Sequence, residues 1–230
     1  MNPHSDITLS TVIGHPDAFE QTLKAVIFSK NQFHFDNVQI LSCVDFKIKD
    51  IKCINIPQMT YGQYNDFMIK KYSEYIDNKY VLHVQNDGFI LNPDSWDNEF
   101  LNYDYIGALW TVVSPDSSYG VNQNNRVGNG GFTLRSKKFL DISAKYCPSH
   151  NGLNEDVVVC RLHRDIFLSH GIKYATDQIA AKFAIEDDEA SDYIGQKHSD
   201  YKTIKTFGFH HRYSSALKLL DTINLNDYYL

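Results

Sequence analysis

Apolar and polar positions follow one another along the first part of the chain in blocks that predict strands and a helix. Residues Ile7–Ile13 form a short apolar-rich segment that predicts a strand. The chain breaks at Gly14–Asp17, and apolar residues then recur at helical spacing from Phe19 to Ile27. Two further apolar segments, Val38–Val44 and Ile51–Ile56, predict strands. The order strand, helix, strand, strand favours an α/β fold.

The middle of the chain repeats this alternation and ends a strand at a polar turn. Apolar and aromatic residues recur at helical spacing from Tyr64 to Ile76, which predicts a second helix. The apolar segment Tyr80–Val84 then predicts a strand that runs directly into the turn Gln85–Gly88. Ligands of open α/β sheets sit beyond the carboxyl ends of strands, so an acid in this turn is expected to face a cleft.

After this turn we expect a polar loop, one more strand and two more helices. Residues Ser114–Gly131 are rich in Ser, Asn and Gly, which indicates a surface loop that could act as a lid or have no function of its own. The later elements are expected at Phe132–Arg135 (strand), at Lys137–Tyr146 (helix) and from Asn154 through Phe167 (helix), with Gly171 as a C-terminal cap. The sequence contains no linker or repeat, so residues 1–230 are expected to form one domain.

Composition supports a globular domain and argues against several other classes of protein. The chain has 230 residues, of which 43% are hydrophobic, so a packed core is expected. The formal net charge of -6 argues against a nucleic-acid partner, because such binding needs a clustered positive surface. The start of the chain does not match a secretory signal, and no apolar run has the length of a membrane span. We therefore expect a cytoplasmic protein with no transmembrane segment.

Two polar turns carry residues that suit ligand binding, and each also has a purely structural interpretation. Asp87 could hold a divalent cation at the end of a strand, because such ions prefer hard oxygen ligands. An Asn-Asp-Gly sequence after a strand is, however, very often only a hairpin turn. The segment Gly128–Gly131 could bring backbone amides close to a ligand, or it could form a plain turn.

Two pairs of titratable residues lie further along the chain. Glu155 or Asp156 could remove a proton from a hydroxyl group, or both could stabilise the first turn of a helix. His210 and His211 are adjacent, and neutral imidazole is a good ligand for Mn²⁺-like ions. Neighbouring side chains on a strand point to opposite faces, so at most one of the two histidines is expected to face the site.

The order of these features resembles the GT-A glycosyltransferases, and most closely the bacterial, fungal and viral glycosyltransferase-like families. The similarity runs from about Tyr64 to His211, and its most specific motifs are D-Y-I-G-A-L-W and G-N-G-G-F-T-L-R. The segments that carry it are Tyr80–Phe89, Asp104–Trp110, Val127–Arg135, Asn154–Val157 and Phe207–His210. The resemblance implies a GT-A-like single domain of the α/β class, with a Rossmann-type mixed sheet flanked by helices.

The resemblance also implies roles for individual residues. Asp87 matches the surviving acid of a D-x-D element that holds a divalent metal on the donor diphosphate, and His210 matches the C-terminal metal ligand. Gln85 stands where the first acid of a complete element would be. Asp156, with Glu155 as the alternative, matches the acid near the acceptor hydroxyl. The expected donor-binding residues are Thr11, Gly14, His15, Tyr64, Gln85, Asn86, Asn129, Gly130 and Gly131.

Metal-dependent glycosyl transfer is the function that the resemblance implies. A nucleotide-sugar donor, expected to carry UDP, would give its sugar to a glycan or another hydroxyl acceptor, and Mn²⁺ or Mg²⁺ would neutralise charge on the departing diphosphate. The replacement of the first acid by Gln85 leaves open a catalytically inactive sugar- or nucleotide-binding module of the same fold. A metal-dependent nucleotidyltransferase is a third class, for which Gly14–Asp17 makes a poor phosphate-binding loop.

Overall fold

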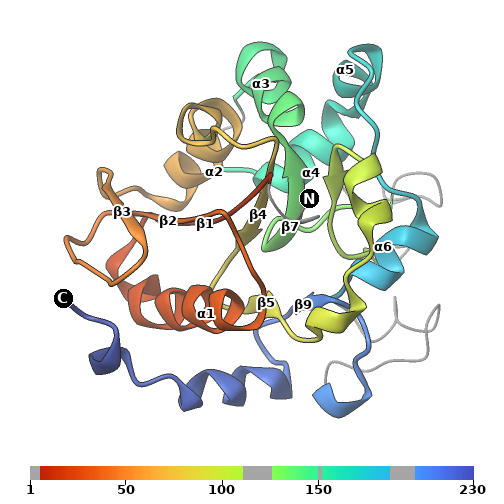
Figure 1. Ribbon diagram of the computed structural model, residues 1–230. Coiled ribbons are helices and arrows are strands. Elements are labelled where there is room, and N and C mark those ends of the chain that lie inside the picture. Colours follow the sequence, from red (N-terminus) through yellow and green to blue (C-terminus); the bar gives the residue numbers. More distant parts are fainter. Residues whose placement is uncertain (1–5, 111–125, 150–151, 187–199) are drawn as a thin grey trace.

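The centre of the computed structural model, which describes residues 6–110, 126–149, 152–186 and 200–230, is a six-stranded mixed sheet (Figure 1). Across the sheet the strands are β3 (Lys52–Asn55), β2 (Asn37–Ser42), β1 (Ile7–Ile13), β4 (Tyr80–Val84), β7 (Phe132–Ser136) and β6 (Tyr105–Ile106). The first four strands are parallel, whereas β7 runs antiparallel to both of its neighbours. The mixed α/β class predicted from the sequence is confirmed.

Helices cover both faces of this sheet (Figure 1). α1 (Phe19–Gln32) lies on one side, and α2 (Tyr61–Lys70) and α3 (Lys137–Tyr146) lie on the other. The later helices are α4 (Glu155–Val157), the π-helix η5 (Val158–Leu162), α5 (Arg164–Ser169) and α6 (Asp177–Phe183). Short 3-10 helices are η1 (Pro16–Ala18), η2 (Tyr72–Tyr75), η3 (Pro93–Ser95), η4 (Asn98–Asn102), η7 (Tyr201–Thr203), η8 (Ser215–Thr222) and η9 (Leu225–Asp227).

A second sheet of three short strands brings the C-terminal part of the chain to the end of β4. In this sheet β5 (Gly88–Ile90) pairs antiparallel with β9 (Gly208–His210), and β9 pairs parallel with β8 (Ala184–Ile185). The register places Gly88 opposite His210. The turn after β4 therefore leads into a different sheet, so a hairpin at Asp87 is the wrong interpretation.

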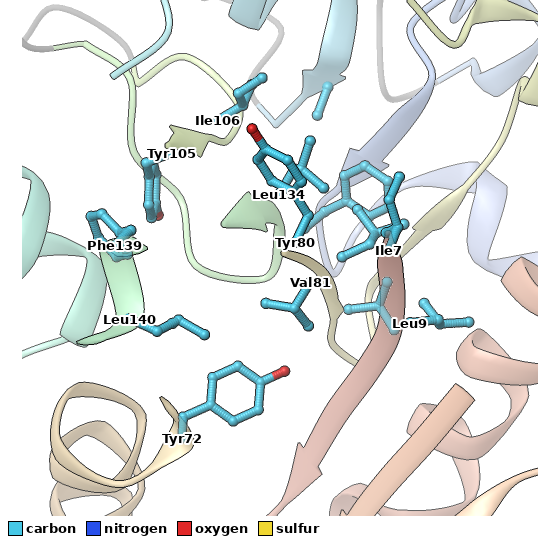
Figure 2. Packing of buried hydrophobic residues seen from close by; sticks show 14 of the residues in the cluster. Ile7, Leu9, Tyr72, Tyr80, Val81, Tyr105, Ile106, Leu134, Phe139 and Leu140 are labelled. Atoms are coloured by element: carbon cyan, nitrogen blue, oxygen red, sulfur yellow. The ribbon is translucent and has the colours of Figure 1, made fainter. Parts of the chain in front are cut away.

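Apolar side chains from the central sheet pack with those of α3 and η2 into one buried cluster (Figure 2). Ile7 and Leu9 of β1, Val81 of β4 and Leu134 of β7 are each at most 1% exposed. Parallel strands that are covered on both faces appear in a sequence as short continuous apolar runs. That physical requirement is the reason these strands could be predicted from the sequence.

Two of the predicted helices are broken in the structure. The expected helix from Tyr64 to Ile76 is instead α2 followed by η2, because Lys71 leaves the helical region with φ -121. The expected helix from Asn154 onward is divided among α4, η5 and α5. Gly171 has φ +71, which agrees with its predicted position at a helix end.

Several elements were not predicted, and one prediction lies outside the described residues. Among the elements that were not expected are α6, β6 and β8. Most of the predicted lid loop, residues 114–125, lies outside the ranges that the structure describes. Within those ranges, every helix is too short or too polar to cross a lipid bilayer.

Candidate functional site

The turn after β4 places Asp87 at the carboxyl end of the central sheet. Gly88 N–H donates to Gln85 O at 3.3 Å, and His211 N–H donates to Asp87 O at 2.9 Å. These bonds fix the turn against the end of β9. Since the pairing of β5 with β9 sets His210 opposite Gly88, the side chains of Asp87 and His210 come together although 123 positions separate them in the sequence.

Asp87 and His210 form a close, largely buried ion pair. Asp87 Oδ1 lies 3.0 Å from His210 Nε2, and each side chain is 17% exposed. Asp87 Oδ1 is buried and has no hydrogen-bond partner among the residues that the structure describes. On the other side of the ring, His210 Nδ1 lies 3.6 Å from Glu186 Oε1. The predicted convergence of Asp87 and His210 is confirmed, and their role as metal ligands stays a prediction.

This pair fits a divalent cation by its donor chemistry and its spacing. A carboxylate oxygen and an imidazole nitrogen are suitable ligands for Mn²⁺-like ions. Two ligands at right angles on an ion with bonds of about 2.1 Å lie about 3 Å apart, and Asp87 Oδ1 and His210 Nε2 have that separation. Within the described ranges, His, Cys, Asp and Glu side chains form no metal-binding group of three or more. An ion at this pair therefore has positions left for substrate oxygens or water.

The charges around His210 favour a cation at this point. Burial acts to lower the pKa of His210, but Asp87 and Glu186 raise that pKa to about 10. Burial acts to raise the pKa of Asp87, but the neighbouring imidazolium lowers it below its ordinary value. Two carboxylates thus flank one ring, and their field stabilises positive charge there, whether carried by a proton or by a metal ion.

The glycine-rich segment before β7 packs against the site so closely that side chains would not fit. A Cβ atom on Gly131 would lie 2.0 Å from His210 Nε2, and one on Gly130 would lie 2.2 Å from Glu155 Oε1. Asn129 has φ +62, and its Oδ1 accepts the Gly131 N–H at 3.0 Å. The segment is therefore both a turn and a wall of the site.

The Asp104–Trp110 motif packs on this glycine-rich segment. A Cβ atom on Gly128 would lie 2.0 Å from the Trp110 ring, and one on Gly107 would lie 1.8 Å from Gly128 O. The backbone N–H of Trp110 donates to Arg126 O at 2.9 Å. The two motifs are thus parts of one packing unit, in which each glycine makes room for an atom of the other motif.

Asp156 and Glu155 lie in different environments. Asp156 Oδ2 accepts the Gly130 N–H at 2.8 Å. Burial and the charge of Glu155 raise the pKa of the half-buried Asp156 to about 6. Glu155 Oε1 instead accepts from Arg135 Nη2 at 2.8 Å, and neither side chain is more than 5% exposed. Of the two candidate bases, Asp156 is therefore the one that is not committed to an ion pair.

Breaking the Arg135–Glu155 pair from one side is expected to destabilise the fold strongly. Arg135→Met leaves the Glu155 carboxylate buried and unpaired, which costs about 3–5 kcal/mol of unfolding free energy. We expect the double variant with Glu155→Met to recover most of this loss. Urea unfolding followed by circular dichroism measures both effects, and Lys71→Met serves as the control because the Lys71–Glu74 pair is exposed. A loss for Arg135→Met as small as that of the control would contradict the prediction.

A cavity of about 330 Å³ opens beside the turn, between the ends of β1, α2 and β4. Small-molecule sites typically have volumes of about 300–1,000 Å³. The predicted donor-binding residues that line it are Gly14, His15, Tyr64, Gln85 and Asn86. Residues that the sequence did not single out also line it, namely Val12, Ala18, Thr22, Met59, Thr60 and Tyr61.

Thr11 is not in this cavity. It is fully buried, and its Oγ1 donates to Val84 O at 2.6 Å. Successive side chains of a strand point to opposite faces, so the neighbouring Val12 lines the cavity instead. Gln85, which stands in the place of an acid, donates from Nε2 to Tyr64 OH at 2.8 Å and so holds the aromatic wall of the cavity.

Glu186, Arg135 and Tyr61 are among the residues at the site that had no predicted role. Arg135 follows the apolar Phe132–Leu134 run within a strand, and that position was the one available signal that its charge is buried. Glu186 directly follows the short β8, and no spacing or motif indicated it. Tyr61 is 64% exposed, and its hydroxyl donates to Asn154 Oδ1 at 2.9 Å beside α4.

Comparison with known proteins gives a family match whose description carries no function. A family model described as "Protein of unknown function (DUF5672)" matches residues 50–210. No curated protein matches the sequence significantly.

Solved structures resemble the chain at low identity. The apo form of the glycosyltransferase GlyE from Streptococcus pneumoniae TIGR4 is 11% identical, with a TM-score of 0.49 over 97% of this chain and 61% of that chain. TarS from S. aureus is 12% identical, with a TM-score of 0.46 over 75% and 60%. The bifunctional IspDF from Campylobacter jejuni is 13% identical, with a TM-score of 0.41 over 75% and 49%. The chain thus spans about half to three fifths of the length of these structures.

Proposed function

We propose that this chain, which belongs to the DUF5672 family of proteins of unknown function, is a glycosyltransferase that moves a sugar from a nucleotide-sugar donor to a hydroxyl acceptor. The observation that carries the proposal is the Asp87–His210 pair, a carboxylate and an imidazole 3.0 Å apart, beside a cavity of about 330 Å³. A nucleotide-sugar donor needs a metal site for its diphosphate and, next to it, a cavity for its nucleoside.

The cavity suits the nucleoside part of the donor. Its lining combines apolar side chains with the rings of Tyr61 and Tyr64. A base stacked on an aromatic ring gains about 1–3 kcal/mol. We propose UDP as the nucleotide, with its diphosphate directed toward Asp87 along the turn that follows Gln85.

We propose that Asp87 and His210 hold Mn²⁺, or Mg²⁺ in its place, on the donor diphosphate. When bound, such an ion stabilises the negative charge that develops on the leaving nucleoside diphosphate. Asp87 contributes an anionic oxygen that has no hydrogen-bond partner among the described residues. His210 contributes Nε2, and Gly131 leaves room for the ring.

We propose that Asp156 takes the proton from the acceptor hydroxyl in an inverting transfer. The acceptor oxygen forms a bond to the anomeric carbon as the bond from that carbon to the diphosphate oxygen breaks. The electron pair leaves with the diphosphate, and the acceptor proton moves to Asp156. The Gly130 N–H orients the carboxylate through its bond to Oδ2, and a pKa of about 6 keeps the group ionised at neutral pH.

A sugar- or nucleotide-binding module without catalysis is the second candidate. It is favoured by the engagement of Gln85 with Tyr64, which leaves Asp87 and His210 as the two metal-ligand candidates at this turn within the described ranges. The two candidates differ in turnover and share donor binding. Slow hydrolysis of a bound nucleotide sugar in the presence of Mn²⁺ would favour the transferase, because a binding module does not consume its ligand.

A thermal-shift screen tests the proposal. We expect UDP with Mn²⁺ to raise the Tm by about 5–10 °C at 100 times its Kd, and UDP without metal to raise it much less. The other nucleoside diphosphates measured under the same conditions establish the base preference. The absence of any nucleotide-dependent shift with Mn²⁺ or Mg²⁺ would rule out a nucleotide-sugar donor.

A further inference from the structure

Arg161 lies beside Asp156, and the proposed transfer chemistry leaves it without a role. It follows Asp156 by five positions, on the π-helix η5. His163 N–H donates to Val158 O at 3.0 Å, which is the i to i+5 bond of a π-turn. In a regular α-helix, two residues five positions apart are separated by about 140° around the axis. The wider turn reduces this angle and brings Arg161 toward the face that carries Asp156.

The indole of Trp110 holds the guanidinium of Arg161 in place. Arg161 Cζ lies 3.6 Å from the centroid of the Trp110 ring. The ring is itself seated against Gly128, where a Cβ atom would lie 2.0 Å from it. Stacking on an aromatic face engages the plane of a guanidinium and leaves its N–H groups, which point outward in that plane, available to a ligand.

One side-chain donor of Arg161 has no partner in the part of the chain that the structure describes. Arg161 Nε is buried without a hydrogen bond there. Burial lowers the pKa of Arg161, and the carboxylates of Asp156 and Glu186 act against this effect. Arg164 makes a useful contrast, because it stacks on Tyr174 at 3.8 Å but donates from Nη1 to Cys160 O at 3.3 Å.

A planar cation with an unpartnered donor beside the proposed catalytic carboxylate suits an acceptor that carries an anion. Arginine binds carboxylate and phosphate groups through two parallel charge-assisted hydrogen bonds. Without such a group, Asp156 and Glu186 would repel an anionic acceptor. Arg161, whose charge interacts with both carboxylates, would compensate for that repulsion.

We propose that Arg161, held against Trp110, binds a carboxylate or phosphate group of the acceptor, so that the acceptor is an acidic sugar or a phosphorylated hydroxyl compound. This inference rests on the proposed function, because it takes Asp156 as the base that faces the acceptor. It defines the chemical class of acceptor, which the motifs of the sequence do not.

A competition among matched acceptors tests the inference. We would measure transfer to methyl glucoside, methyl glucuronide and methyl glucoside 6-phosphate. The wild-type protein is expected to favour one of the two anionic acceptors over the neutral one in kcat/KM by about 10- to 100-fold. Whichever anionic compound is preferred identifies carboxylate or phosphate as the group. Equal rates on all three acceptors, or a preference for the neutral one, would overturn the inference.

Variants assign this preference to Arg161. Arg161→Gln is expected to bring the anionic-to-neutral ratio close to one, and Arg161→Lys to give an intermediate ratio, because lysine keeps the charge but loses the planar fork. Arg164→Gln, the stacked arginine with its own partner, is expected to keep the wild-type ratio. A ratio is insensitive to a general loss of activity or of folded protein. A wild-type ratio in both Arg161 variants would contradict the proposal.

An experiment without turnover separates failure of this inference from failure of the proposed function. The chain has two tryptophans, so its NMR spectrum has two indole N–H signals, from Trp96 and Trp110. Titration with methyl glucuronide and with methyl glucoside 6-phosphate is expected to shift the Trp110 signal and to leave that of Trp96 in place. Methyl glucoside at equal ionic strength is the control. A nucleotide-dependent thermal shift with an unmoved Trp110 signal would reject the anion site while the transferase proposal stands.

Discussion

Replacing Asp156 with Asn is expected to lower kcat/KM for glycosyl transfer by about 10²- to 10⁴-fold, the contribution typical of a general base. Asn has nearly the shape of Asp, and its oxygen can still accept the Gly130 N–H that Asp156 Oδ2 accepts at 2.8 Å. The substitution removes the proton acceptor and keeps the Gly130 bond, but it loses the bond that Asp156 Oδ1 accepts from the Val157 N–H at 2.7 Å, because an amide NH₂ group cannot accept. Initial rates with a saturating donor measure the loss, and the nucleotide-dependent thermal shift checks that donor binding is retained.

The pH profile gives this prediction a second readout. Burial raises the pKa of Asp156 to about 6, so the carboxylate is ionised above that pH and becomes protonated below it. The wild-type kcat/KM is expected to fall about tenfold for each pH unit below 6, because a protonated carboxyl cannot accept the acceptor proton. Asp156→Asn is expected to lose this acidic limb. A variant that keeps both the wild-type rate and the limb would remove Asp156 from the reaction.

The fold was largely predictable because its strands are buried on both faces. Ile7–Ile13 and Tyr80–Val84 appear as apolar runs in the sequence, since α1 covers one side of the sheet and α2 and α3 cover the other. The π-turn at Val158–Leu162 could not be predicted, because its residues keep ordinary helical periodicity. The two-residue strands β6 and β8 are too short to carry any pattern.

The site was predictable in part, through motifs whose physical meaning the structure supplies. Asp87 and His210 were identified as a pair by resemblance alone, because their contact depends on the pairing of β5 with β9 far apart in the sequence. Gly131 has to be glycine because His210 lies against it, a requirement that no local pattern expresses. Glu186 and Arg161 follow short or irregular elements, so their approach to the site depends on tertiary structure.

Replacing Asp87 with Asn is expected to abolish the metal dependence of both donor binding and turnover. The substitution removes the negative charge at Oδ1, the atom 3.0 Å from His210 Nε2. Removing a residue that only hydrogen-bonds to a metal ligand weakens metal affinity by about 10- to 100-fold. Removing a ligand itself is therefore expected to weaken Mn²⁺ affinity by more than about 100-fold. Isothermal titration with Mn²⁺ in the presence of UDP measures this change directly.

The Asp87→Asn substitution is expected to keep the backbone of the turn while it weakens the ion pair with His210. The backbone of Asp87 keeps its bond to the His211 N–H, and Asn has nearly the shape of Asp, so the turn itself is retained. Asp94→Asn, at an exposed acid that follows β5, is the matched control and should bind Mn²⁺ as the wild type does. Wild-type Mn²⁺ affinity in Asp87→Asn would exclude a metal-bridged diphosphate at this turn. The close approach of Asp87 to His210 would then be an ion pair between a carboxylate and an imidazolium and nothing more.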